Sequence, residues 1–439
     1  MDHQQGPQGL NRRTALALGG GFALVGAAGA AQAQAKTFNW TLARPESVGM
    51  STAGLAEIDR AMAALIAKKD LTGAVTAVAR RGKLVHYKAH GVSDIETGAP
   101  MPRDAIFRMM SSTKPTIGVA VLMMMEAGKL SIDDKVGRFI PEFRDTKVAV
   151  GPAGFERALR DPAARAAIAA QVKIEPARRD ITIKDLMTHT SGLSSGGAGA
   201  LVSTVRRRPD DTLATYIPRL GAVPLDFQPG SQWRYSASDG IDVLARIVEI
   251  TSGQPMDVFA AERIFQPLDM RDTYFNVPAS KRSRILTLYG NEDGEWRPRR
   301  AAFGYQPIPY FSGAGGLMST AHDYIQFEQM LLGKGQLNGK RLLKPETVTL
   351  MSTNHVGDLY GGTGGTTKGT GFGLTVRVLQ DPQAAKSGRS AGAFGWAGAY
   401  GTTSWTDPKE ELTAAIMVQQ PGTTALSDFE FAIRKAIVA

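Results

Sequence analysis

One segment organises the chain: Phe107-Arg108-Met109-Met110-Ser111-Ser112-Thr113-Lys114-Pro115. The residues that follow, from 117 to 125, are all apolar or glycine. A helix that is apolar on every side is normally buried in the middle of a domain. Ser111 and Lys114 are spaced i and i+3, so a helix would place both side chains on one face. The segment therefore predicts a buried helix whose first turn presents a hydroxyl beside an amine.

The start of such a helix favours nucleophilic catalysis. Backbone N–H groups there lack helical partners and lie at the positive end of the helix dipole. A nucleophile, an amine that shifts a neighbour's pKa and an oxyanion donor can meet at this point. A Ser-x-x-Lys pattern arises about once by chance in a chain of this length. An N-cap serine with a solvated lysine is the alternative, so the prediction needs partners elsewhere in the chain.

Composition sets the class of protein. The chain has 439 residues, 43% hydrophobic and 21% charged, which is ordinary for a globular protein. The net charge is +10, but the basic residues are spread out, so no nucleic-acid partner is expected. The absence of cysteine excludes disulfides, thiolate catalysis and zinc–thiolate sites. His86 and His90 would share a strand face, but no third ligand is near them in the sequence, so no metal and no cofactor are expected.

The N-terminus is typical of an export signal. Arg12 and Arg13 precede a weakly apolar Gly/Ala-rich run, and Ala-x-Ala cleavage patterns end at Ala33 and Ala35. Paired arginines before such a run indicate twin-arginine export. We therefore expect residues 1–35 to be removed and the protein to be periplasmic or secreted. The run is too short to span a membrane, and no other membrane segment is visible.

The order of predicted elements indicates an α+β fold. Predicted strands lie near both ends of the chain and predicted helices lie between them. A sandwich domain is expected from 36–110 together with 300–439, and a mainly helical domain from 111–299, with the active site at their interface. The individual predictions are helices over 51–69, 111–128, 163–170, 320–332 and 427–437, and strands over 73–79, 84–91, 372–378, 401–406 and 412–418.

Two further segments complete a pattern with Ser111 and Lys114. Tyr235 stands at a loop-to-helix junction, and Trp396-Ala397-Gly398 stands just before a C-terminal strand. The combination resembles the serine β-lactamase and penicillin-binding protein superfamily, most closely the class C-like family VIII carboxylesterases. Residues 186–193 and 315–320 are also typical of that family. The resemblance covers nearly the whole chain after residue 35 and implies an antiparallel sheet flanked by helices.

The resemblance also implies roles for these residues. Ser111 would attack the substrate carbonyl and form an acyl-enzyme, and the backbone N–H groups of Ser111 and Ala399 would bind the oxyanion. A phenol has a pKa of about 10, so Tyr235 needs a lowered pKa to accept the serine proton. A nearby Lys114 ammonium would favour the phenolate. Tyr235 would later activate water for deacylation.

Two departures from the lactamase pattern favour an esterase. Trp396 replaces the lysine of the Lys-Thr-Gly segment, and Ala237 replaces the asparagine of Tyr-x-Asn. Both changes remove polar groups that would hold a β-lactam, and they make the substrate pocket more apolar. Tyr310 lies near the glycine-rich loop at 313–316, where it either lines the acyl pocket or packs in the core. His189 is expected to be a structural hydrogen-bonding residue.

Other motifs offer alternatives to this site. Lys386-Ser387-Gly388 matches the third lactamase segment literally, but it lies in a loop. Ser194 and Ser390 both match the Gly-x-Ser-x-Gly nucleophile elbow, which requires a strand, a turn, a helix and later Asp and His residues. No histidine follows Ser390, and a predicted helix rather than a strand precedes Ser194.

The expected function is hydrolysis of carboxylic esters, with short acyl chains favoured and a small-molecule ester as the substrate. A β-lactamase, a D-amino-acid peptidase, an acyltransferase or an amidase could use the same groups. A catalytically silent, penicillin-binding-like envelope protein is the alternative from another class. The sequence does not indicate the oligomeric state.

Overall fold

The computed structural model describes residues 40–156, 161–301, 303–361 and 367–438. The predicted export signal lies outside these ranges. Residues Lys36–Ala439 form one unit by their internal contacts, so the division into a sandwich and a helical domain stays a prediction. None of the helices in the described ranges is long and apolar enough to cross a bilayer.

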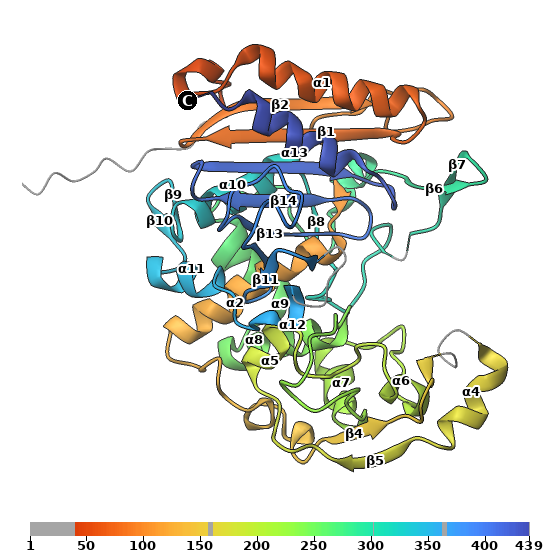
Figure 1. The fold of residues 1–439 in the computed structure, drawn as a ribbon. Helices are drawn as coiled ribbons and strands as arrows, with labels where there is room; N and C mark the ends of the chain where they lie inside the picture. Colours follow the sequence, from red (N-terminus) through yellow and green to blue (C-terminus); the bar gives the residue numbers. More distant parts are fainter. Residues whose placement is uncertain (1–39, 157–160, 302, 362–366, 439) are drawn as a thin grey trace, which may run out of the picture. The chain divides into compact units, whose positions relative to one another are not determined.

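A seven-stranded antiparallel sheet forms the centre of the fold (Figure 1). The first and last parts of the chain meet in it, because β1 pairs with β2 on one side and with β15 on the other. From one edge to the other the strands are β11 (Thr370–Phe372), β12 (Arg377–Leu379), β13 (Phe394–Ala397), β14 (Thr403–Asp407), β15 (Leu412–Val418), β1 (Gly73–Arg80) and β2 (Lys83–Gly91).

Two terminal helices cover one face of this sheet (Figure 1). Helix α1 (Thr52–Ala67) begins at the Ser51 cap, and helix α13 (Ala425–Ala436) packs beside it. Their apolar side chains, spaced three and four residues apart, bury a core with the strands that includes Ile58, Phe429 and Trp405. The predicted helices over 51–69 and 427–437 are thus present with slightly different ends.

The other face contacts α10 (Ala321–Leu332), and beyond it lies the largest apolar core. Helix α2 (Lys114–Glu126) belongs to this core and packs against α8 (Asp239–Ser252). Nearly all side chains of α2 are buried, as predicted from its apolar composition. The α-helix starts at Lys114 rather than at Ser111, because Met110–Thr113 form a 3-10 turn in front of it.

The remaining elements are short. The helices are α4 (Pro162–Ala169), α5 (Ile183–Met187), α6 (Gly199–Val202), α7 (Leu213–Tyr216), α9 (Met256–Ala260), α11 (Pro345–Met351) and α12 (Asp358–Gly361). The strands are β3 (Phe107–Arg108), β4 (Lys147–Val150), β5 (Lys173–Pro176), β6 (Leu288–Glu292), β7 (Glu295–Arg299), β8 (Met318–Ser319), β9 (Gln336–Leu337) and β10 (Lys340–Arg341).

One strand prediction is corrected. The predicted strand over 372–378 is interrupted: Phe372 ends β11, Arg377 begins β12, and residues 373–376 form a tight connection between them, because Thr375 has a φ of 67° and the Gly373 N–H bonds to the Val376 carbonyl. The segment Trp396-Ala397-Gly398 precedes a C-terminal strand, β14, as predicted, and its first two residues also belong to β13. The hairpins β4–β5 and β6–β7 were not predicted within the helical region.

Candidate active site

Ser111 and Lys114 lie where the 3-10 turn enters α2. The Lys114 side chain is fully buried, whereas Ser111 is partly exposed. Lys114 Nζ lies 3.1 Å from Ser111 Oγ and 2.8 Å from each of the carbonyl oxygens of Ala237 and Ala314. The i, i+3 spacing therefore brings the hydroxyl and the amine together, as predicted. The sequence did not indicate the two backbone carbonyls that accept hydrogen bonds from the amine.

Tyr235 reaches the same point from the loop before α8. Its hydroxyl lies 2.7 Å from Ser111 Oγ, and Lys114 Nζ lies 5.1 Å from the centre of its ring. The structure thus brings together all three residues that were predicted to be catalytic, across 124 positions of sequence between Ser111 and Tyr235.

The protonation pattern differs from the sequence-based expectation. Burial lowers the pKa of Lys114 to about 7, and the Asp242 carboxylate only partly opposes this shift. Burial raises the pKa of Tyr235, although its hydrogen bond with Ser111 acts in the opposite direction. The expectation that a Lys114 ammonium would lower the pKa of Tyr235 is therefore wrong. Near neutral pH, the amine is the group that can readily lose a proton.

Asp242, which was not among the predicted site residues, holds the loop that binds the Lys114 amine. This fully buried carboxylate on α8 accepts hydrogen bonds from Tyr310 Oη at 2.8 Å, Ser312 Oγ at 2.9 Å and the Ala314 N–H at 2.9 Å. These bonds fix the loop whose Ala314 carbonyl receives Lys114. One signal in the sequence could have identified Asp242: it is a carboxylate between apolar residues, on the side of an amphipathic helix that is expected to be buried.

Tyr310 belongs to this support. It was expected to line the acyl pocket or to pack in the core, and only 3% of its surface is exposed. Its hydroxyl donates to Asp242, and its ring packs edge-on against Tyr216. The side chain therefore packs in the core and shapes the loop at 313–316.

Aromatic side chains surround Tyr235. The ring centres of His189 and Trp396 lie 4.8 and 5.7 Å from that of Tyr235, and Phe372 packs against both. Trp233 adds a further ring on the same side. Trp396 is partly exposed, as expected of a residue that contacts substrate. These rings form an apolar wall beside Tyr235.

Several polar atoms in this wall have no hydrogen-bond partner among the described residues. They are both ring nitrogens of His189 and the indole nitrogens of Trp233 and Trp396. His189 was expected to be a structural hydrogen-bonding residue, but only its backbone acts this way, accepting from the Arg234 N–H at 3.1 Å. Burial and the neighbouring Lys114 hold the pKa of His189 well below its ordinary value, so the ring is neutral.

The third predicted segment docks directly against the turn that contains Ser111. A side chain at Gly398 would place its Cβ 2.2 Å from the Met109 carbonyl oxygen, so only glycine fits at this contact. Thr402 Oγ1 donates to the same carbonyl at 2.9 Å. The predicted oxyanion donors, the N–H groups of Ser111 and Ala399, belong to the two segments that meet here. Ala237 is exposed, and its carbonyl holds Lys114.

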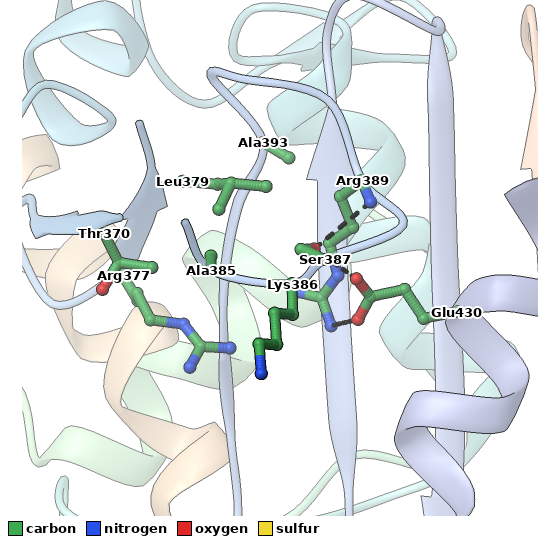
Figure 2. A pocket seen from close by; sticks show the side chains of 9 residues that line it. All are labelled: Thr370, Arg377, Leu379, Ala385, Lys386, Ser387, Arg389, Ala393 and Glu430. Carbon is green, nitrogen blue, oxygen red and sulfur yellow. Dashed lines mark hydrogen bonds and ion pairs between the residues drawn. The ribbon is translucent and has the colours of Figure 1, made fainter. Parts of the chain in front are cut away.

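The alternative motifs lie elsewhere. Lys386 and Ser387 line a cavity of about 100 Å³ together with Arg377, Arg389 and Glu430, and no predicted catalytic residue lines it (Figure 2). Ser387 and Arg389 are engaged there with Glu430 of α13.

The nucleophile-elbow candidates lack their partners. Ser390 Oγ bonds to Glu410 at 3.4 Å. Ser194 lies in a loop, and the two histidines that follow it make contacts elsewhere: His322 with Asp323 and His355 with the Leu350 carbonyl. Neither elbow motif therefore has a histidine as base.

Comparison with known proteins agrees with this geometry. Residues 58–437 match the family model described as Beta-lactamase. Protein Rv1367c of Mycobacterium tuberculosis is 36% identical over 362 residues, covering 80% of this chain and 86% of that protein. Esterase EstB of Burkholderia gladioli is 30% identical over 427 residues, covering 90% and 98% of the two chains.

A solved structure supports the same assignment. The structure of EstCE1, described as a hydrolase with promiscuous acyltransferase activity, has a TM-score of 0.70 at 26% sequence identity and covers 88% of this chain and 99% of that chain. The expected α+β fold of β-lactamase and transpeptidase type is thus confirmed, and the chain belongs to the beta-lactamase family.

Proposed function

We propose that the protein is a cofactor-free serine carboxylesterase that forms an acyl-enzyme on Ser111. One observation carries the proposal: Ser111 Oγ lies between Lys114 Nζ at 3.1 Å and Tyr235 Oη at 2.7 Å. A serine hydroxyl becomes a useful nucleophile when an adjacent base takes its proton. Esterase EstB, similar over nearly its whole length, supports ester hydrolysis as the reaction.

Lys114 is the base for acylation in this proposal. A neutral amine has two N–H donors and one lone pair. The carbonyls of Ala237 and Ala314, both at 2.8 Å, accept the two N–H bonds, which leaves the lone pair for the Ser111 hydroxyl. A pKa of about 7 for Lys114 makes this neutral form abundant at neutral pH.

Tyr235 serves as the proton donor. Its phenol remains protonated because burial raises its pKa. Lys114 takes the Ser111 proton while Oγ attacks the ester carbonyl, and the oxyanion forms at the Ser111 and Ala399 N–H groups. When the intermediate collapses, Tyr235 protonates the departing alkoxide, and the proton held by Lys114 restores the phenol. Water then cleaves the acyl-enzyme by the reverse sequence of proton transfers.

The shape of the wall favours apolar esters over β-lactams. Trp396 stands where a lactamase has lysine, and Ala237 stands where it has asparagine. The rings of Phe372 and Trp396, 5.2 Å apart, offer apolar contact instead of a cation for a substrate carboxylate. We therefore place short-chain carboxylic esters first and β-lactams second among substrates.

Kinetics with two chromogenic substrates test the proposal. Wild-type protein is expected to hydrolyse p-nitrophenyl butyrate with a much higher kcat/KM than nitrocefin. Ser111→Ala is expected to reduce kcat for the ester by at least about 1,000-fold. Ser194→Ala, which changes a loop serine outside the site, is the matched control and should keep full activity. Wild-type turnover by Ser111→Ala, or loss of turnover in Ser194→Ala alone, would refute the assignment.

Acyl transfer is a second candidate function, favoured by one comparison. EstCE1 is described as a hydrolase with acyltransferase activity. An acyl-Ser111 intermediate could pass its acyl group to an alcohol in place of water. Product analysis with and without a short alcohol measures this, and an ester of the added alcohol is the expected product of transfer.

A further inference from the structure

Two histidines and an aspartate meet on the face of the sheet that α1 covers, away from the proposed active site. One ring nitrogen of His86, one of His90 and one carboxylate oxygen of Asp59 all lie within 4.8 Å of one another. We propose that these three side chains bind a divalent transition-metal cation of the zinc class, which links α1 to β2. The proposal is independent of the esterase function.

Strand register explains why the histidines converge. In the β1–β2 pair, Val78 lies opposite His86 and Ala74 opposite His90, and Thr76 lies between them. Ala74 and Val78 belong to the core under α1, so their partners on β2 face the same helix. Asp59 follows Ile58, which α1 buries against the sheet.

Thr76 holds both imidazoles in place. Its fully buried hydroxyl oxygen lies 2.8 Å from Nε2 of His86 and 2.8 Å from Nε2 of His90. The two rings are nearly parallel, with an interplanar angle of 15°. A shared hydroxyl of this kind is the type of outer contact that orients metal-binding histidines.

Asp59 supplies the second, independent observation. Its Oδ1 is buried and has no hydrogen-bond partner among the described residues, while Oδ2 lies 2.5 Å from Lys88 Nζ. A buried carboxylate oxygen without a partner is costly. A cation between Oδ1 and the imidazoles would satisfy it.

The chemistry of the ligands selects the metal. Imidazole nitrogens and carboxylate oxygens are common ligands of transition-metal cations. Two imidazoles and a carboxylate suit Zn²⁺, with ligand distances of about 2.0–2.2 Å and water in the open position.

The three residues of this cluster are not neighbours in the sequence. Asp59 comes from a helix that precedes β1, and only the fold brings it beside His86 and His90. The expectation of no metal rested on the lack of a third ligand, and the structure provides one.

Metal titration tests the proposal. Full-length protein without a polyhistidine tag is stripped with a chelator and titrated with ZnSO₄ by calorimetry and with CoCl₂ by visible absorption. One equivalent is expected to bind, and binding should raise the melting temperature. His86→Gln, His90→Gln and Asp59→Asn should each weaken binding at least about tenfold.

Two further variants sharpen the test. His355→Gln removes a histidine whose ring bonds the Leu350 carbonyl, away from the cluster, so this variant should bind zinc like wild type. Lys88→Gln removes the competing ammonium and should strengthen binding. Ester turnover by the metal-free variants reports that they are folded. Absence of saturable binding to the wild type, or unchanged affinity in both His86→Gln and His90→Gln, would overturn the proposal.

Discussion

The assignment of Lys114 as the base makes a prediction about pH. The acidic limb of kcat/KM for an ester should follow deprotonation of this amine, with a midpoint near pH 7. Below pH 6 the rate should fall about tenfold for each pH unit, and above about pH 8 it should level off. Asp242→Asn should move the limb to lower pH, because the carboxylate raises the pKa of Lys114 and its removal lowers that pKa.

Burial of Lys114 determines how much of the amine is neutral at pH 7. An ordinary lysine with a pKa of 10.5 would be neutral in about one molecule in 3,000 at pH 7, whereas a pKa of about 7 makes about half of the molecules neutral. The buried position therefore increases the population of reactive amine by roughly 1,500-fold at pH 7. This factor is comparable to the whole effect usually assigned to one general base.

The assay is pH-stat titration of a short-chain ester between pH 5 and pH 9, because it needs no indicator that ionises in this range. Burial raises the pKa of Asp242 to about 6, so two groups titrate close together and Asp242→Asn separates them. Asparagine can keep the hydrogen bonds that Ser312 and Ala314 give to Oδ1. A flat profile across pH 6 to pH 8, or a limb that Asp242→Asn shifts upward, would refute the reasoning.

Three further predictions concern the same site. Gly398→Ala should lower ester kcat/KM at least about tenfold with an unchanged circular dichroism spectrum, because its Cβ would meet the Met109 carbonyl at 2.2 Å; full activity would contradict the contact. Trp396→Lys should raise the ratio of nitrocefin to ester turnover, and an unchanged ratio would show that this side chain does not set specificity. The stability of the wild type relative to Lys114→Met should increase as the pH rises from about 7 to 10.5. The difference between their unfolding free energies should grow by about 1.4 kcal/mol per pH unit, because over this range only the unfolded lysine keeps its proton. Urea unfolding at several pH values measures this difference.

Much of the fold follows from local patterns. The apolar run of α2, the hairpin of β1 and β2 and the terminal helices are strong signals because each has one periodicity over many residues. The β11–β12 connection was missed because Thr375 adopts a positive φ that threonine rarely takes, so nothing in its sequence marks a turn. Short hairpins such as β4–β5 give too few alternating residues to be recognised.

The sequence predicted which side chains meet at the candidate site, but not the groups that surround them. Ser111, Lys114 and Tyr235 could be proposed because their chemistry resides in residue type and spacing. The carbonyls that bind Lys114 are backbone groups, present in every residue, and no sequence pattern distinguishes Ala314 from its neighbours. Asp59 shows the same limit for the metal cluster, since only tertiary packing places it near β2.

We propose Lys114, and not Tyr235, as the base because both side chains are buried. Two effects compete at this pair: attraction between an ammonium and a phenolate, which favours both charges, and loss of water, which disfavours both. Residue identity suggests the first effect, and complete burial of Lys114 makes the second one win. Any change that admits water beside the Ala314 carbonyl should therefore raise the pKa of Lys114 and weaken the base. The apolar wall that we propose favours esters and the buried amine that we propose as the base for Ser111 thus depend on the same exclusion of water.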